Sequence, residues 1–215
     1  MTVSFKLRLL LPLICLLLWS IPGLAGTRPV LLVLGDSLSA GYGLQPGQGW
    51  VDLLRRRLQA QGLDWQVVNA SITGDTTEGG LARLPAALQR HRPALVVIEL
   101  GGNDGLRGFP LQRIRANLRR LVQLAREAGA RVLLLGVRLP ANYGAYAERF
   151  HALYREVAEA EGVPLVDFFL EGVAETRALM QADGIHPAAA AQPRILDNIW
   201  PALRPLLSSN PTEGD

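Results

Sequence analysis

The sequence predicts an α/β protein built on one doubly wound, five-stranded parallel sheet with helices on both faces. Short apolar runs alternate along the chain with longer segments whose apolar residues recur every three or four positions. The apolar runs hardly alternate with polar residues, which is typical of strands buried on both faces. Alternating strands and helices form a parallel sheet whose connecting helices cover both sides.

The first 25 residues precede this fold and have the layout of a secretory signal peptide. Lys6 and Arg8 form a short basic region, residues 9–19 an apolar region, and residues 23–25 a small-residue cleavage pattern. Serine, proline and glycine interrupt the apolar run before it reaches the ~20 residues of a membrane span. We therefore expect cleavage after Ala25 and export to the periplasm, with secretion beyond it as an alternative and with no stable membrane anchor after cleavage.

Composition excludes several classes of site. The one cysteine, Cys15, lies in the segment to be removed and follows Ile14, where a lipoprotein site needs a small residue, so neither a lipid anchor nor a catalytic thiol is expected. Without Lys6 and Arg8 the net charge falls from +3 to +1, with 20 basic residues scattered among 19 acidic ones. The basic run 55–57 is interpreted as a solvated helix face, and nothing indicates nucleic-acid binding.

The elements follow in order. The predicted strands are 30–34, 66–69, 95–100, 132–137 and 163–166, and the helices between them are 49–61, 77–89, 111–128 and 146–161. Gly62, Gly129 and Gly162 follow three of these helices, where a left-handed C-cap is expected. A last helix over 188–207 contains three prolines, Pro193, Pro201 and Pro205, which predict a break or kink.

Five strands favour the flavodoxin-like order 2-1-3-4-5, in which ligands bind at the carboxyl ends of the strands near the switch point. The chain has 215 residues, of which 49% are hydrophobic, enough for the core of one domain. We expect that domain to span residues 26–207, followed by a flexible tail over 208–215.

Polar and small residues gather in the loops expected at that sheet edge. Ser37 follows the first strand, Gly74 the second and Asn103 the third, and Asp183 and His186 come after the fifth. Taken singly, each has an ordinary structural explanation, as a helix cap, a bend or a left-handed turn residue. Placed together at one edge, they favour acyl transfer.

Acyl transfer requires four kinds of group. A serine nucleophile needs a base, for which imidazole is suited, and the imidazole needs a carboxylate to orient it. The developing oxyanion needs fixed donors, such as backbone N–H groups or an asparagine amide. Of the three histidines, His91 precedes a strand and His151 lies within a predicted helix, so His186 is the candidate base.

Competing motifs fail on spacing or partners. Gly35-Asp36-Ser37-Leu38-Ser39 lacks the second glycine of the Gly-x-Ser-x-Gly elbow, and the chain has no dinucleotide fingerprint or P-loop. Asp36, Asp75 and Asp104 have no histidine or glutamate beside them and are interpreted as turn residues rather than metal ligands. We expect no metal and no cofactor.

These stretches make the sequence resemble the SGNH/GDSL hydrolases, in particular the periplasmic TesA-type group of thioesterases, lysophospholipases and arylesterases. The matching segments are "GDSLSAGYG", "VVNASITGDTT", "ELGGNDGLRG", "VRLPANYG" and "MQADGIHP". The resemblance implies Ser37 as nucleophile, Asp183 and His186 as the rest of the triad, and an oxyanion hole of the Ser37 and Gly74 backbones with the Asn103 amide.

We therefore expect a cofactor-independent serine esterase, acting as a monomer on acyl esters, aryl esters, thioesters and lysophospholipids. A carbohydrate O-deacetylase of the same family and a catalytically silent binding protein on this fold are the alternatives. The candidates for the acyl and leaving-group surroundings are Leu38, Leu106, Leu139, Pro140, Tyr143 and Ile185.

Overall fold

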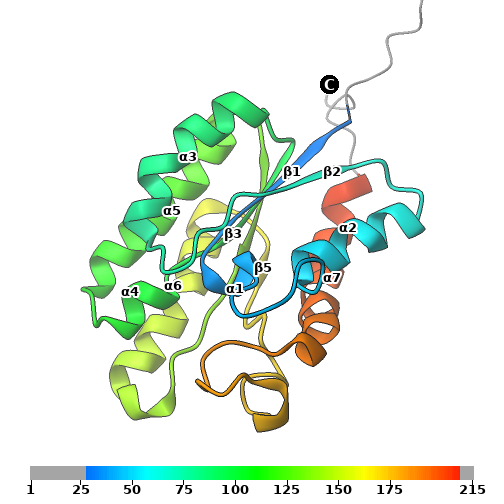
Figure 1. Cartoon of the computed structure of the whole chain (residues 1–215). Helices are drawn as coiled ribbons and strands as arrows, with labels where there is room; N and C mark the ends of the chain where they lie inside the picture. Colours follow the sequence, from blue (N-terminus) through cyan, green and yellow to red (C-terminus); the bar gives the residue numbers. More distant parts are fainter. Residues whose placement is uncertain (1–27, 209–215) are drawn as a thin grey trace, which may run out of the picture.

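The computed structural model describes residues 28–208 and forms three layers, a parallel sheet between two groups of helices (Figure 1). The strands are β1 (Val30–Gly35), β2 (Gln66–Asn69), β3 (Leu95–Glu99), β4 (Arg131–Leu135) and β5 (Leu165–Val166), in the order β2-β1-β3-β4-β5. The predicted fold class and strand order are confirmed. The predicted signal peptide lies outside the described residues. Of the tail predicted over 208–215, Ser208 is instead the last residue of the final helix, and residues 209–215 lie outside the described residues.

Helices on the two faces bury the sheet. The long helices α3 (Thr77–His91), α5 (Leu111–Glu127) and α6 (Ala145–Glu161) lie together on one side, and α2 (Trp50–Ala60) packs against α7 (Gln192–Ser208) on the other (Figure 1). β1, β3 and β4 are buried almost throughout, as predicted. The expectation of two-sided burial is wrong for β2, where Gln66 and Asn69 are exposed because the strand forms an edge of the sheet.

The predicted break in the last helix is wrong, because α7 continues through Pro201 and Pro205. Pro193 lies in its first turn, where a backbone N–H has no partner inside the helix to lose. Pro201 and Pro205 are on the exposed side, where water can solvate the carbonyl groups that lose a backbone donor. The opposite side buries Leu196, Ile199, Leu203 and Leu207, and this packing stabilises the helix.

Short elements at the carboxyl edge of the sheet were not predicted. α1 (Ser37–Ala40) follows β1 directly, and α4 (Gly102–Leu106) follows β3. Three short 3-10 helices complete the described chain, at Ala141–Tyr143, Arg177–Leu179 and Ala189–Ala191. The predicted left-handed glycines are confirmed, with φ of 68° at Gly62, 81° at Gly129 and 61° at Gly162.

Candidate active site

The register of β1 and β3 brings the loops after these strands side by side. Gly35, the last residue of β1, pairs with Glu99, the last residue of β3. The chain turns sharply after both, and Ser37 and Asn103 lie in the short helices that begin there. The structure therefore places both residues at the edge of the sheet where the sequence predicted a site.

Three of the predicted residues form a continuous chain of contacts. The Nε2 atom of His186 lies 3.0 Å from the Ser37 hydroxyl oxygen, and its Nδ1 atom lies 2.7 Å from Oδ2 of Asp183. Oδ1 of Asp183 also accepts hydrogen bonds from the backbone N–H groups of Ile185 (2.9 Å) and His186 (3.0 Å). These bonds, with the His186 side chain first, lower the pKa of Asp183 to about 2. In the folded protein at neutral pH, Asp183 is therefore negatively charged.

The other two histidines lie elsewhere. His91 ends α3, ahead of β3 and at the opposite end of the sheet. His151 lies within α6, with its Nε2 atom 3.1 Å from Oδ2 of Asp167 and 3.2 Å from Nε of Arg138. The structure thus brings only His186, among the described histidines, to Ser37.

Asn103 lines the same cavity as Ser37, and its amide bonds to Asp75, the residue that follows Gly74. Gly74 has a φ of +80°, a backbone conformation that favours glycine. Asn103 is part of α4 rather than in the left-handed turn considered from the sequence. Its Nδ2 group donates to Oδ2 of Asp36 (3.1 Å) and to the carbonyl of Asp75 (2.9 Å). Both amide hydrogens are therefore used within the protein, and an oxyanion has to replace one of these acceptors.

A buried pair of carboxyl groups supports this arrangement. Glu99 is fully buried and accepts hydrogen bonds from the Ser39 hydroxyl (2.7 Å) and the Asp36 backbone N–H (3.3 Å). Asp36 caps α1 by accepting from the Leu38 N–H at 3.0 Å. Burial raises the pKa of Asp36 to about 6, and burial with the neighbouring Asp36 charge raises that of Glu99 well above its usual range. As the pH rises, Asp36 therefore loses its proton before Glu99 does.

The aspartates considered as metal ligands have separate protein partners. Asp104 accepts from the Thr77 backbone N–H (2.9 Å) and hydroxyl (2.6 Å), which joins α4 to the start of α3. Asp75 forms an ion pair with Arg83 at 2.7 Å. Within residues 28–208 no group of metal-ligating side chains is assembled. Asp36, Asp75 and Asp104 instead fix the loops around Ser37.

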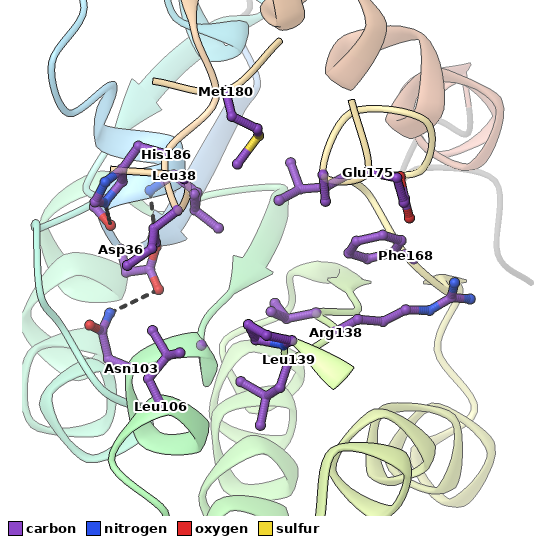
Figure 2. Close-up of a pocket in the computed structure, with 18 of the residues that line it drawn as sticks. Asp36, Leu38, Asn103, Leu106, Arg138, Leu139, Phe168, Glu175, Met180 and His186 are labelled. Atoms are coloured by element: carbon purple, nitrogen blue, oxygen red, sulfur yellow. Dashed lines mark hydrogen bonds between the residues drawn. The ribbon is translucent and has the colours of Figure 1, made fainter. Parts of the chain in front are cut away.

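A cavity of about 600 Å³ opens beside Ser37 and His186 (Figure 2). Five of the predicted pocket residues line it: Leu38, Leu106, Leu139, Pro140 and Ile185. Tyr143 does not, because its hydroxyl points to the Leu106 carbonyl, to which it donates at 3.0 Å. Several further lining residues were not predicted from the sequence, among them Val137, Arg138, Phe168, Leu170, Glu175 and Met180.

The cavity is apolar near the middle and polar at its far side. In Figure 2, Asp36, Asn103 and His186 lie at one side, and Phe168, Arg138 and Glu175 at the other. The Arg138 guanidinium lies over the Phe168 ring, 4.8 Å from its centroid, and also pairs with Asp167 and Glu171. Arg138 and Glu175 are both exposed, so their charges remain in contact with solvent at this side of the cavity.

Comparisons with known proteins identify the family of this chain. A model of the GDSL-like Lipase/Acylhydrolase family matches residues 33–193. The chain is 61% identical to Esterase TesA of Pseudomonas aeruginosa over 178 residues, 82% of this chain and 89% of that protein. It is 49% identical to thioesterase 1/protease 1/lysophospholipase L1 of Escherichia coli K12 over 185 residues, 86% of this chain and 88% of that protein. A crystal structure of TesA superposes with a TM-score of 0.81 at 60% identity, covering 82% of this chain and 99% of that one.

Proposed function

This chain belongs to the GDSL-like lipase/acylhydrolase family and is a serine esterase, and from that premise we propose that Ser37, His186 and Asp183 are its catalytic triad. The observation that supports this most directly is the unbroken series of contacts from the Ser37 hydroxyl through His186 to Asp183, at 3.0 and 2.7 Å. This is the arrangement in which an imidazole can activate a serine.

The reaction has two halves. In the first, the Ser37 oxygen attacks the ester carbonyl carbon while His186 accepts the hydroxyl proton, and Asp183 orients the imidazole and stabilises its cationic form. His186 then donates that proton to the departing alcohol or thiol, which leaves an acyl group on Ser37. In the second half, His186 takes a proton from water as the water oxygen attacks the acyl carbonyl. The bond to Ser37 then breaks, His186 returns the proton to the Ser37 oxygen, and the carboxylic acid departs.

Negative charge develops on the carbonyl oxygen in both halves. We assign its stabilisation to the backbone N–H groups of Ser37 and Gly74 and to the Asn103 amide. The Asn103 amide adjoins the buried Asp36 carboxylate in the free protein. Exchanging that acceptor for the oxyanion replaces one charged partner by another, so the donor remains paired throughout the reaction.

The cavity favours the proposal that the substrates carry acyl groups of modest chain length and include aryl esters, thioesters and lysophospholipids. Its wall is built mainly of aliphatic and aromatic side chains, which suits an acyl chain better than an acetylated sugar. Arg138 and Glu175 place two exposed charged groups at the far side of the cavity. All triad residues come from one chain, which is consistent with an active monomer.

The first test replaces the base. His186→Gln should lower kcat/KM by about 10³-fold or more, and His91→Gln and His151→Gln serve as matched controls that should remain within a few-fold of the original enzyme. Equal losses at two histidines would contradict the assignment.

The second test ranks substrates. A series of p-nitrophenyl esters of increasing chain length, with lysophosphatidylcholine and an acetylated sugar beside it, should show highest kcat/KM for short to medium acyl esters. Preference for the acetylated sugar would identify a carbohydrate O-deacetylase instead.

We also propose that the protein is exported after cleavage near Ala25. Lys6, Arg8 and the apolar run that follows support this. Between residues 28 and 208, no helix has the length and apolar character needed to cross a bilayer. Mass spectrometry of the protein from the periplasmic fraction should find an N-terminus at or near Gly26, whereas an intact Met1 in membranes would show a retained anchor.

A further inference from the structure

Gln181 connects the loop that follows Ser37 to the loop that carries His186. Its side-chain Nε2 group donates one hydrogen bond to the Tyr42 carbonyl, at 2.8 Å, and a second to the Pro187 carbonyl, at 3.0 Å. Tyr42 follows α1 by two residues, and Pro187 directly follows His186. One carboxamide therefore bonds to both halves of the site, which are far apart in the sequence.

The backbone of Gln181 also forms hydrogen bonds to the loop that carries His186. Its N–H donates to the His186 carbonyl at 2.7 Å, and its own carbonyl accepts from the Gly184 N–H at 3.0 Å. Arg177 donates to that carbonyl as well, at 3.1 Å. Gln181 thus forms hydrogen bonds to three positions in this loop, which are Gly184, His186 and Pro187.

Other hydrogen bonds hold this loop as well: Arg177 donates to the Ala182 carbonyl at 3.2 Å, and the Ala188 N–H donates to the Leu179 carbonyl at 2.7 Å. Residues 182–185 are all exposed, so core packing does not fix the backbone on which Asp183 lies. An exposed loop keeps one conformation only where hydrogen bonds hold it. The bonds of Gln181 therefore belong to the network that sets the position of Asp183 and His186, and they connect this network to Tyr42.

The facing loop leaves space for the Gln181 side chain. A Cβ atom at Gly43 would lie 2.1 Å from the Gln181 Oε1 atom, so any larger residue at position 43 would displace the carboxamide. The neighbouring Tyr42 ring lies 4.4 Å from the His186 ring, between centroids, at a tilt of 41°. By bonding the Tyr42 carbonyl, Gln181 holds the backbone from which this ring extends.

We propose that Gln181 is a positioning residue for catalysis, which holds His186 and Asp183 in register with Ser37 and takes no part in proton transfer. This inference rests on the proposed triad. A displacement of ~1 Å in a reacting group can reduce a rate by ~10²-fold, so a residue acting only through hydrogen bonds can have a large effect on kcat.

The test is Gln181→Met, which keeps the length of the side chain and removes both donors. We expect kcat for p-nitrophenyl butyrate, and the rate of Ser37 phosphonylation by a fluorophosphonate, to fall at least about tenfold. KM should remain within about twofold because Gln181 does not line the cavity. Gln123→Met is the matched control: its Nε2 also donates one hydrogen bond, to Glu161 at 3.1 Å, and its rates should be unchanged.

Rates are expressed per phosphonylated site, so that loss of folded protein does not mimic slow catalysis. A normal kcat per site in Gln181→Met, even with a lower melting temperature, would overturn the inference and leave only a structural role. Activity of Ser37→Ala or His186→Gln would instead overturn the triad, so the two failures are distinguishable.

A double-mutant cycle gives a second test. Gly43 has a φ of +73°, so Gly43→Ala introduces backbone strain in any background. The displacement of the carboxamide occurs only where Gln181 is present. Gly43→Ala should therefore lower kcat by a larger factor in the original enzyme than in Gln181→Ala, and equal factors in the two backgrounds would contradict the proposed contact.

Discussion

Replacement of Asn103 by alanine separates the two tasks that its side-chain amide can perform. In the proposed mechanism the amide donates to the oxyanion, and in the free protein it donates to the buried Asp36 carboxylate at 3.1 Å. Asn103 belongs to α4, so alanine preserves the backbone conformation better than glycine. The variant therefore keeps the helix but loses the amide hydrogen bonds to Asp36 and to the Asp75 carbonyl.

The two tasks have different magnitudes and different pH dependences. Loss of one oxyanion donor lowers kcat by ~10²–10³-fold, about 2.7–4 kcal/mol, with little effect on KM. Loss of a partner of a buried charged group costs about 1–3 kcal/mol of stability. Asp36 is 2% exposed and its pKa is raised to about 6, so it carries its charge mainly above pH 6. The stability loss should therefore be larger at pH 8 than at pH 5.

Steady-state kinetics with p-nitrophenyl butyrate and urea unfolding at both pH values measure these effects. Asn117→Ala is the matched control, because its amide donates a single hydrogen bond, at 3.0 Å, to the Thr77 hydroxyl in α3. Its kcat should be unchanged. If Asn103→Ala has a kcat within twofold of the original, the amide is not an oxyanion donor and the backbone donors act alone.

Three further predictions follow from single contacts. In the folded protein Glu99 keeps a proton that the unfolded chain releases above pH 4.5. The free energy of unfolding should therefore fall by about 1.4 kcal/mol per pH unit from pH 4.5 up to the raised pKa of Glu99. Urea unfolding at several pH values should show that Glu99→Gln abolishes this pH-dependent loss of stability. Asp183→Asn should lower kcat by ~10⁴-fold because the amide favours the wrong imidazole tautomer, and kinetics near the original would exclude Asp183 as the orienting group. Tyr143→Phe should leave the preference for ester chain length unchanged but cost about 1 kcal/mol in urea unfolding, since only the bond to the Leu106 carbonyl is lost; a changed preference would return Tyr143 to the pocket.

Local patterns were sufficient to predict the sheet and the place of the site. Runs of apolar residues identified all five strands, and their alternation with helices fixed the parallel order. The loops at the carboxyl edge then contained Ser37, Asn103 and His186. These predictions succeeded because each depends on neighbours in the sequence or on the shared direction of parallel strands.

Features that depend on distant contacts could not be predicted in this way. Glu99 ends an apolar strand, and only the fold shows that its carboxyl group lies beside Asp36. The role of Gln181 depends on Tyr42, which is 139 residues away. The predicted break in α7 failed because packing of its buried side compensates for two internal prolines.

Identification of the serine that a fluorophosphonate labels tests the central claim most directly. Peptide mass spectrometry of the labelled protein should place a single adduct on Ser37, and Ser37→Ala should remain folded and unlabelled. Ser39 donates its hydroxyl to Glu99 and is 2% exposed, so it should not react. An adduct on Ser39 or Ser71, or undiminished labelling of Ser37→Ala, would contradict the assignment of Ser37 as the nucleophile.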